Sequence, residues 1–516
     1  MRPTLSTPEQ AAQWLRTLVR GTLGSDSRSL GAGDGFVATP GALVDGRSYV
    51  TQALQQGVAA CLVEAQGLDA FGLDDRRVAA YDGLKGDAGA IADAFFGQPS
   101  DHLNVLAITG TNGKTSCAWW LAQALSALPA PMTQACALVG TLGVGQPPLP
   151  KTPSTEQHRD ALAALRSTGM TTPDAVSLQA ALTQFVSQGL RACAIEASSI
   201  GIEEGRLNGL RIRLAVFTNF TQDHLDYHGS MQAYWEAKRR LFSWSGLQSA
   251  VVNIDDAQGA KLALELAGEK SELDLWTTST QAAARLQARN IVHTAGGLRF
   301  DVVEAGQTCT LQSQVIGHYN VSNLLNVVAT LRALGVGLAM AVQTCEQLRP
   351  VPGRLECLGG EDAPLVVVDY AHTPDALAQT LDALRPLAQQ RAGELWCVFG
   401  CGGDRDAAKR PLMGAIAAAK ADHTVVTSDN PRSEKPASIV AQILAGMAGQ
   451  PQAEVQVDRS SAIQSAIGRA AKGDVVLLAG KGHEETQEIN GVKSVFSDRT
   501  HALEALAQRK VLEMHA

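Results

Sequence analysis

A glycine-rich segment that follows an apolar stretch contains the residues best suited to chemistry. Residues 105–109 are typical of a buried strand, and residues 116–128 have the composition of a helix. Glycines between them permit tight turns, and the first amides of the helix face outward, an arrangement that binds phosphate. Lys114 would reach the terminal phosphates, and the hydroxyl of Thr115 would face Mg²⁺. The segment predicts a site for ATP or another nucleoside triphosphate, and a glycine turn with a solvated lysine is the alternative. Its residues are Gly110, Thr111, Asn112, Gly113, Lys114, Thr115 and Ser116.

Three further residues are candidates for metal ligation, although each also has a plainer interpretation. Glu196 ends an apolar strand and would otherwise be a solvated carboxylate, but beside a phosphate loop we expect it to bind Mg²⁺. His224 lies within Gln-Asp-His-Leu-Asp and would otherwise be a hydrogen-bonded loop histidine. Lys238 lies on a predicted helix, and its position alone suggests a surface lysine.

The composition argues against several classes of protein. A net charge of −8 disfavours nucleic acid as the main partner, because binding it requires clustered lysines and arginines. The nine cysteines include no Cys-x-x-Cys pair, so we expect reduced thiols. The start of the chain lacks the features of a signal peptide, and no apolar run approaches the roughly 20 residues that span a membrane. We expect a cytoplasmic protein, without membrane insertion, that acts on small molecules.

The length of 516 residues predicts about three domains, because one hydrophobic core cannot serve so long a chain. Residues 1–100 predict a small α/β unit. Residues 101–347 alternate apolar strands with helices, which predicts a parallel sheet covered on both faces. Residues 348–516 form the third unit, which begins at a joint with two prolines and a glycine. Residues 145–167 are rich in proline, threonine, glutamine and charged residues, which predicts a surface insertion or mobile loop.

Polar residues follow each of the apolar strands that are predicted in the last of these units. These strands are expected at residues 365–369, 395–399, 424–427 and 475–479. In an open α/β sheet the ligand lies outside the carboxyl ends of the strands. We therefore expect the polar ends to converge on one cleft.

Five segments in the expected order resemble motifs of the Mur ligases and their relatives, the folylpolyglutamate synthases. Besides the loop at 110–115, they lie at residues 218–229, 317–323, 352–354 and 369–374. The resemblance covers nearly the whole chain. It implies an α/β fold of three domains: a uridine-nucleotide domain, a central P-loop ATPase-like parallel sheet and a C-terminal Rossmann-like domain. Closure of the domains would assemble the site and exclude water.

The resemblance also implies an ATP-dependent ligase that makes an amide through an acyl phosphate, with Mg²⁺ as the second cofactor. It makes Lys114, His224 and Lys238 the catalytic residues, with Lys238 carbamylated. The implied Mg²⁺ ligands are Thr115, Glu196, His224 and Lys238. Asn320, Asp369 and His372 would join the loop at the nucleotide, and Arg354 would approach its phosphate end.

The motif at residues 428–432 distinguishes family members that add meso-diaminopimelate. Diaminopimelate has a distal carboxylate that lysine lacks. Arg432 would bind this carboxylate with two parallel hydrogen bonds from its guanidinium. Asp429, Asn430 and Pro431 complete the motif, and an Asx-Pro turn is the alternative interpretation. Arg405, Gly480 and Glu484 are the further contacts that the resemblance implies.

The site for the acceptor, the UDP-N-acetylmuramoyl dipeptide, is less clear from the sequence. The resemblance implies contacts from Ser27, Thr171, Thr172, Ser198, Glu204 and Arg206. Met170, Ile200 and Glu204 depart from the usual pattern. Glu204 would place negative charge beside an anionic acceptor, which costs affinity unless the charge is neutralised.

The resemblance as a whole implies ligation of meso-diaminopimelate to UDP-N-acetylmuramoyl-L-alanyl-D-glutamate, a step in peptidoglycan precursor synthesis, by a monomer. A sister ligase for lysine or glutamate, or a folate polyglutamylating enzyme, is the nearest alternative and would need a different pocket at Arg432. A nucleotide-dependent protein that no longer ligates is a second alternative. The presence of Lys114, Glu196 and Lys238 argues against it.

Overall fold

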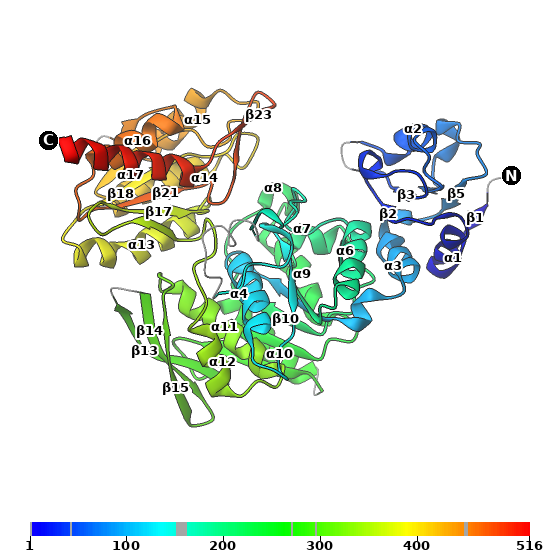
Figure 1. The fold of residues 1–516 in the computed structure, drawn as a ribbon, viewed down its shortest axis with the longest axis horizontal. Helices are drawn as coiled ribbons and strands as arrows, with labels where there is room; N and C mark the ends of the chain where they lie inside the picture. Colours follow the sequence, from blue (N-terminus) through cyan, green and yellow to red (C-terminus); the bar gives the residue numbers. More distant parts are fainter. Residues whose placement is uncertain are drawn as a thin grey trace.

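Three separate β-sheets organise the chain in this computed structural model (Figure 1). The structure describes residues 3–41, 44–150, 162–269, 272–294, 297–447 and 453–515. The units that contain the first and last sheets lie on opposite sides of the central unit. Residues 151–161 of the predicted insertion at 145–167 lie outside the described residues. Within its described part, Arg166 forms an antiparallel bridge with Val144, which lies just before the insertion.

The first sheet is parallel throughout, in the order β1-β5-β4-β3-β2. Its strands are β1 (Thr4–Leu5), β2 (Leu23–Gly24), β3 (Gly35–Ala38), β4 (Ala60–Glu64) and β5 (Val78–Tyr81). The helices are α1 (Pro8–Leu18), α2 (Val50–Gln55) and α3 (Leu84–Phe96), with 3₁₀ turns η1 (Ser27–Ser29), η2 (Gly46–Tyr49), η3 (Leu68–Phe71) and η4 (Pro99–His102). Helix α1 begins where the Thr7 hydroxyl accepts from the Gln10 amide and Pro8 supplies a preset φ.

The central sheet has the order β15-β14-β13-β12-β11-β10-β6-β9-β7-β8. The strands from β12 to β7 are parallel, as predicted. They are β6 (Asn104–Thr109), β7 (Cys136–Gly140), β9 (Ala192–Glu196), β10 (Leu214–Phe217), β11 (Ser249–Asn253) and β12 (Asp274–Ser279).

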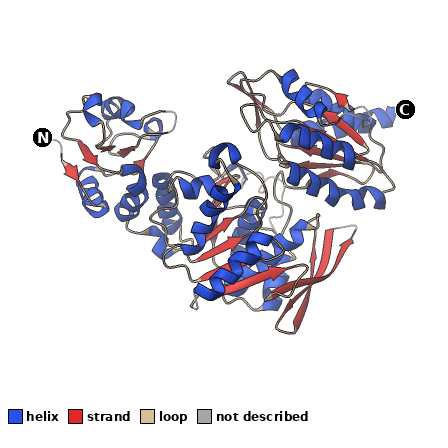
Figure 2. Cartoon of the chain, turned by 180° about the vertical axis from the view of Figure 1, so that it is seen from behind, coloured by secondary structure: helices blue, strands red, loops and turns tan. Residues whose placement is uncertain are grey.

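Antiparallel pairings extend both ends of this sheet, a feature that the prediction of a parallel sheet missed. They join β8 (Gly143–Gly145) to β7, and they join β14 (Gly297–Glu304) to β13 (Leu286–Thr294) and β15 (Gln307–Ser313), whereas β13 itself is parallel to β12. Strands β13 to β15 reach beyond the helices (Figure 2). Much of β15 is exposed and its side chains are mostly polar, so it lacks the apolar run of a strand buried on both faces.

Helices cover both faces of the central sheet. Their bounds are α4 (Lys114–Ala127), α6 (Ala175–Ser187), α7 (Ser199–Glu203), α8 (Leu225–His228), α9 (Met231–Arg239), α10 (Ala257–Glu269), α11 (Tyr319–Ala333) and α12 (Leu338–Cys345), with the turn η5 (Arg240–Ser243). One apolar core contains side chains of α4, α11 and α12, and a second contains side chains of α6, η5 and α10. The two cores lie on opposite faces, since alternate residues of β6 point into each.

The third sheet has the order β16-β17-β21-β18-β19-β20, and only β16 is antiparallel among its described strands. Its strands are β16 (Glu356–Gly359), β17 (Leu365–Asp369), β18 (Leu395–Phe399), β19 (His423–Val426), β20 (Glu454–Val455) and β21 (Val475–Ala479). Helices α13 (Pro374–Gln390), α14 (Lys409–Lys420), α15 (Pro436–Ala445), α16 (Arg459–Arg469) and α17 (Asp498–His515) cover it. Strands β22 (Thr486–Ile489) and β23 (Val492–Val495) form a separate hairpin.

The cysteines, the helices and the last strands bear on three further expectations: reduced thiols, no membrane insertion and the strands after residue 348. All nine cysteines lie within the described residues as free thiols. Among the described helices, none combines the length and apolar character needed to cross a membrane. The strands predicted after residue 348 are confirmed as β17, β18, β19 and β21.

A fully buried ion pair connects the last helix to the ends of two strands in the third sheet. Arg459 donates to both carboxylate oxygens of Asp498 at 2.7 and 2.6 Å, and neither side chain is exposed. The same guanidinium donates to the carbonyls of Ser428 and Ala479 at 3.2 and 2.9 Å. Arg459 therefore holds in place the carboxyl ends of β19 and β21.

The substitution Asp498→Asn should destabilise the C-terminal unit by about 3 kcal/mol or more, because it leaves the buried guanidinium without its counter-charge. Hydrogen exchange of the β21 amides, followed by mass spectrometry, measures this loss. The control is Asp362→Asn, which breaks an exposed pair with Lys472 and should cost less than about 1 kcal/mol. Equal acceleration of exchange in both variants would contradict the prediction.

Candidate functional site

The phosphate loop follows β6 and is supported by the segment after β10. The amides of Thr111 and Asn112 donate to the backbone and side-chain oxygens of Asn219 at 2.8 and 2.9 Å. Thr218 donates its hydroxyl to the carbonyl of Asn112 at 2.6 Å. A Cβ on Gly110 would meet the Thr218 hydroxyl oxygen at 1.9 Å, so only glycine permits this close approach. The sequence did not single out Asn219 as part of the loop's support.

Two lysines converge on one backbone oxygen of this loop. Lys114 donates to the carbonyls of Gly110 and Thr111 at 2.9 and 2.8 Å, and Lys238 donates to that of Gly110 at 2.8 Å. Lys238 is 1% exposed and its amine lies 4.4 Å from the centre of the Tyr234 ring. In the described part of the chain no carboxylate lies within ion-pair distance of Lys238. It is therefore not the surface lysine that its sequence position suggested.

Burial lowers the pKa of both lysines, and that of Lys238 falls well below its ordinary value. The second cause for Lys238 is repulsion from the charge of Lys114. The amine of Lys238, beside the charge of Lys114, is therefore favoured in its neutral, nucleophilic form.

Glu196 ends β9 with its carboxylate beside the hydroxyl of Thr115. The Thr115 hydroxyl donates to Glu196 Oε2 at 2.8 Å. Thr141 donates its amide to Oε1 at 2.8 Å and its hydroxyl to Oε2 at 3.2 Å. Carboxylate and hydroxyl oxygens are the ligands that Mg²⁺ prefers. No group of three His, Cys, Asp or Glu side chains within the described ranges is arranged to hold a metal ion. A cation here would thus draw further ligands from phosphate and water.

His224 lies close to the two lysines, in the left-handed backbone region at φ +52°. Its ring nitrogen Nε2 is 3.5 Å from Asp223 Oδ2, and its ring centroid is 6.0 Å from that of Tyr234. Burial lowers the pKa of His224 to about 4, against the opposing effect of Asp223. The ring is consequently neutral near pH 7, the form in which histidine ligates metals.

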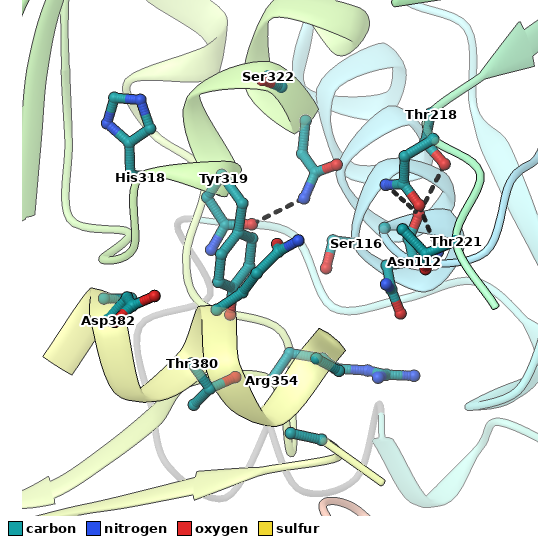
Figure 3. A pocket seen from close by; sticks show the side chains of 18 of the residues that line it. Asn112, Ser116, Thr218, Thr221, His318, Tyr319, Ser322, Arg354, Thr380 and Asp382 are labelled. Atoms are coloured by element: carbon teal, nitrogen blue, oxygen red, sulfur yellow. Dashed lines mark hydrogen bonds between the residues drawn. The ribbon is translucent and has the colours of Figure 1, made fainter. Parts of the chain in front are cut away.

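A cavity of about 470 Å³ opens beside the loop, between the central and C-terminal units (Figure 3). Asn112 and Ser116 lie on one side, His318 and Tyr319 lie at the start of α11, and Thr380 comes from α13. The cavity also includes the predicted nucleotide residues Asn320, Asp369 and His372. Its size and mixed polar lining suit a nucleotide.

Two polar contacts cross this cavity. Arg354 donates to the Thr115 hydroxyl at 3.1 Å and stacks over Tyr370, with 4.5 Å between its guanidinium carbon and the ring centroid. Asn112 donates to Asp375 at 3.2 Å.

Asp369 has a structural role as well, because its two oxygens accept from the amides of Leu355 and Ala371 at 2.8 and 2.9 Å. Burial raises its pKa.

The predicted amino-acid residues meet at the carboxyl end of the third sheet. Asn430 donates to Glu484 at 2.8 Å, and a Cβ on Gly480 would lie 2.7 Å from an Asp429 oxygen. Arg432, at φ +51°, donates its side chain to the carbonyl of Gly403 at 2.7 Å. Arg405 is exposed and donates to the carbonyl of its neighbour Asp404. The expected convergence of the polar strand ends is confirmed, and Pro431 is buried within it.

Most of the predicted acceptor residues surround the same strand end as Glu196. Thr172 donates to the carbonyl of Glu196 at 2.7 Å and lies 2.9 Å from the Ser198 hydroxyl. Arg206 donates to the carbonyl of Thr172 at 2.9 Å, and Thr171 lies 3.1 Å from Thr141, oxygen to oxygen. Ser27, which begins η1 after β2, is not brought to this group, because the first sheet lies to one side of the central unit.

Glu204 has a cationic partner that the sequence did not reveal. Lys85, from α3, lies 2.5 Å from one carboxylate oxygen, and the Tyr227 hydroxyl donates to the other at 2.5 Å. The hydrogen bond from Lys85 is the main cause of the lowered pKa of Glu204. Lys85, in the neighbouring unit, therefore offsets the negative charge of Glu204. Met170, another of the departing positions, contacts Arg206.

Comparison with known families gives matches along the chain. The family description "Mur ligase middle domain" matches residues 108–331, "Mur ligase, glutamate ligase domain" matches 353–482, and "Mur ligase family, catalytic domain" matches 21–80. A protein of Acidovorax sp. (strain JS42), named UDP-N-acetylmuramoyl-L-alanyl-D-glutamate--2,6-diaminopimelate ligase, is 58% identical over 509 residues, 98% of each chain. A protein of that name from Pseudomonas aeruginosa is 45% identical over 497 residues, covering 96% of this chain and 97% of its own.

This chain is also similar to solved structures. A structure described as UDP-N-acetylmuramoyl-L-alanyl-D-glutamate--2,6-diaminopimelate ligase is 34% identical, with a TM-score of 0.63 over 95% of both chains. The MurF ligase of Thermotoga maritima in complex with ADP has a TM-score of 0.66 over 96% of this chain and 98% of its own. At 16% identity, this second likeness supports the fold alone.

The substitution Gly113→Ala should weaken ATP binding at least about tenfold, because a Cβ at this position would lie 2.4 Å from Asn323 Oδ1 in the cavity wall. Calorimetric titration with ATP measures the change. Gly306→Ala is the matched control: its φ of +83° is close to the +84° of Gly113, but nothing lies within 4 Å of its Cβ. Both variants carry a backbone strain of about 1 kcal/mol. An equal loss of ATP affinity in both would show that strain, and not the contact with Asn323, is responsible.

Proposed function

This chain belongs to the Mur ligase family of ATP-dependent amide-bond-forming ligases, and we propose that it joins meso-diaminopimelate to UDP-N-acetylmuramoyl-L-alanyl-D-glutamate. The identity of 58% to a relative with that name supports this substrate pair. The product would be a tripeptide precursor of peptidoglycan.

The observation that carries the proposal is the arrangement of Arg432, Asn430 and Glu484 at one sheet end. Diaminopimelate differs from lysine in having a carboxylate as well as an ammonium group at its distal end. The guanidinium of Arg432 suits that carboxylate. The carboxylate of Glu484, which keeps 29% of its side chain exposed, suits the ammonium. Lysine would offer no carboxylate to the rest of the Arg432 guanidinium, which disfavours the binding of lysine.

The reaction would proceed in two steps. First an oxygen of the acceptor carboxylate attacks the γ-phosphorus of ATP, the bond to the β,γ-bridging oxygen breaks, and acyl phosphate and ADP result. Lys114, Arg354 and the loop amides would stabilise the negative charge of this transfer. Then the amine nitrogen attacks the acyl carbon and loses a proton as phosphate leaves. Enclosure by the units would protect the acyl phosphate from water.

The donor set beside the loop fits Mg²⁺, which would supply charge neutralisation at the phosphates. Thr115 and Glu196 would hold it with hard oxygens, and their hydrogen bond of 2.8 Å shows that both reach one point. Lys238 would contribute after its neutral amine combines with CO₂, forming a carbamate and releasing a proton. His224 would supply a neutral nitrogen ligand to a second cation, as the resemblance implies.

Three further features belong to the proposal. The domains would span residues 1–100, 101–347 and 348–516, with the acceptor lying across them. The protein would act as a monomer. It would work in the cytoplasm, since its ATP and UDP-linked substrates are nucleotides of that compartment.

Phosphate release in the presence of ATP, Mg²⁺ and UDP-N-acetylmuramoyl-L-alanyl-D-glutamate tests the proposed reaction. We expect release with meso-diaminopimelate and a tripeptide product by mass spectrometry, with little release for L-lysine or D-glutamate. Activity with lysine alone would preserve the ligase assignment and overturn the substrate. No release with any of the three amines would contradict the proposed activity.

The substitution Arg432→Lys should raise the KM for meso-diaminopimelate at least about tenfold, because an ammonium cannot make the paired hydrogen bonds of a guanidinium. The KM for ATP should stay within about twofold, since Arg432 does not line the nucleotide cavity. Steady-state kinetics with each substrate varied in turn gives both values. Equal changes in both would show that Arg432 does not recognise the distal carboxylate.

Carbamylation of Lys238 should give a ¹³C NMR carbamate signal when the protein is equilibrated with ¹³C-bicarbonate. The signal is expected because burial lowers the pKa of this amine and so favours its neutral form, which is the form that reacts with CO₂. Lys238→Arg should abolish the signal and the ligase activity. Lys261→Arg, at an exposed position in α10, is the control and should change neither. The same spectrum in the parent and Lys238→Arg proteins would exclude the carbamate at this site.

A further inference from the structure

Lys481 is a fully buried cation whose polar contacts all lie in the amino-acid pocket. Its side chain is 0% exposed, and its amine donates to Glu484 Oε2 at 2.8 Å and to Asn430 Oδ1 at 3.1 Å. Asp429 Oδ1 lies 3.7 Å away. An ammonium group has three hydrogens and can only donate, and its burial without acceptors is strongly unfavourable. The three oxygens must therefore face Lys481.

This requirement decides which way the Asn430 amide points. Its oxygen accepts from Lys481 and also from the amide of Glu488 at 3.0 Å. Its NH₂ group donates one hydrogen to Glu484 Oε2 at 2.8 Å, the oxygen that also accepts from Lys481, and no acceptor among the described residues takes the other hydrogen. Rotation of the amide by half a turn would direct N–H groups at the ammonium, so the cation excludes that orientation. Asn430 consequently presents a donor to the pocket.

The hairpin of β22 and β23 holds the adjoining backbone in the same way. Gln487 donates its side chain to the carbonyl of Asp429 at 2.7 Å. The amide of Arg432 donates to the carbonyl of Glu488 at 3.0 Å, and the carbonyl of Arg432 accepts from Asn490 at 2.7 Å. The backbone is thus fixed independently of Lys481, and what Lys481 adds is the orientation of the polar groups.

The charges in this cluster do not cancel. Asp429 and Glu484 contribute two negative charges and Lys481 offsets one of them, which leaves one negative charge beside the cation of Arg432. A group with one ammonium and one carboxylate complements this pair of opposite charges. Without Lys481 the two carboxylates would repel one another and rotate toward solvent.

We propose that Lys481 is a positioning residue that sets the polarity of the amino-acid pocket. It holds Asn430 Oδ1 and Glu484 Oε2, which leaves the second N–H of Asn430 for the distal carboxylate and Oε1 of Glu484 for the distal ammonium of the incoming amino acid. The inference rests on the proposed function, because it assigns a cause to the recognition of diaminopimelate. Lys481 itself does not touch the substrate.

The substitution Lys481→Met keeps the length of the side chain and removes its charge. We expect the KM for meso-diaminopimelate to rise at least about tenfold, the typical loss for a charge-assisted contact, while the KM for ATP stays within about twofold. A double-mutant cycle with Asn430→Ala should be non-additive, because Lys481 and Asn430 donate to the same oxygen of Glu484 and share one hydrogen-bonded cluster. Lys472→Met, at a 65% exposed lysine of the same unit, is the control and should change neither KM.

An unchanged KM for diaminopimelate in folded Lys481→Met, or equal rises in both KM values, would overturn the inference. Should Lys481→Met fail to fold, Asn430→Asp provides the test. That variant retains the oxygen facing Lys481 and replaces the outward N–H by an oxygen, so the KM for diaminopimelate should again rise at least about tenfold. An unchanged KM there would also overturn it. A parent protein that rejects diaminopimelate but uses another amine refutes the proposed substrate alone, and the same KM comparisons are then made with that amine.

Discussion

The hydrogen bonds between the phosphate loop and the segment after β10 are the contacts on which the rest of the site depends. Parallel pairing of β6 with β10 brings the two strand ends together. Asn219 and Thr218 then fix the loop backbone through Thr111 and Asn112. Because of this support, the carbonyl of Gly110 points at both lysines and Thr115 lies beside Glu196. A loop held only by its own turns would not align groups from four different elements.

Two units line the cavity that suits a nucleotide, so ATP bound there would join the two units. Arg354 reaches Thr115 from beyond the joint at residue 348, and Asp375 accepts from Asn112. A nucleotide between these groups would contact both units at once. Its binding would therefore favour arrangements in which the amino-acid pocket approaches Glu196 and the acceptor residues around it, as expected of an enzyme that closes before it forms an acyl phosphate.

Buried cations in this protein differ in which groups offset their positive charge, and the difference matches the roles proposed for them. Arg459 is paired with Asp498 inside the C-terminal unit, which stabilises the strand ends. Lys481 is surrounded by three oxygens and orients them. Lys238 contacts a backbone carbonyl and an aromatic ring, neither of which carries a full negative charge. Burial therefore lowers the pKa of Lys238 and favours its reactive, neutral amine. The surroundings of each cation thus decide whether it stabilises, orients or reacts.

The local sequence determined the strands, the phosphate loop and the polar strand ends, because apolar runs, glycine spacing and helix starts act over a few residues. It therefore predicted β17, β18, β19 and β21, the loop at Gly110 to Ser116 and the convergence at Asp429 and Gly480. It did not predict the antiparallel β13 to β15, whose partly exposed strands lack a long apolar run. Only the tertiary structure decided that Lys238 is buried, that Lys85 offsets Glu204, and that Lys481 lies beneath Asn430. Burial and long-range pairing depend on which elements pack together, and no short stretch of sequence contains that information.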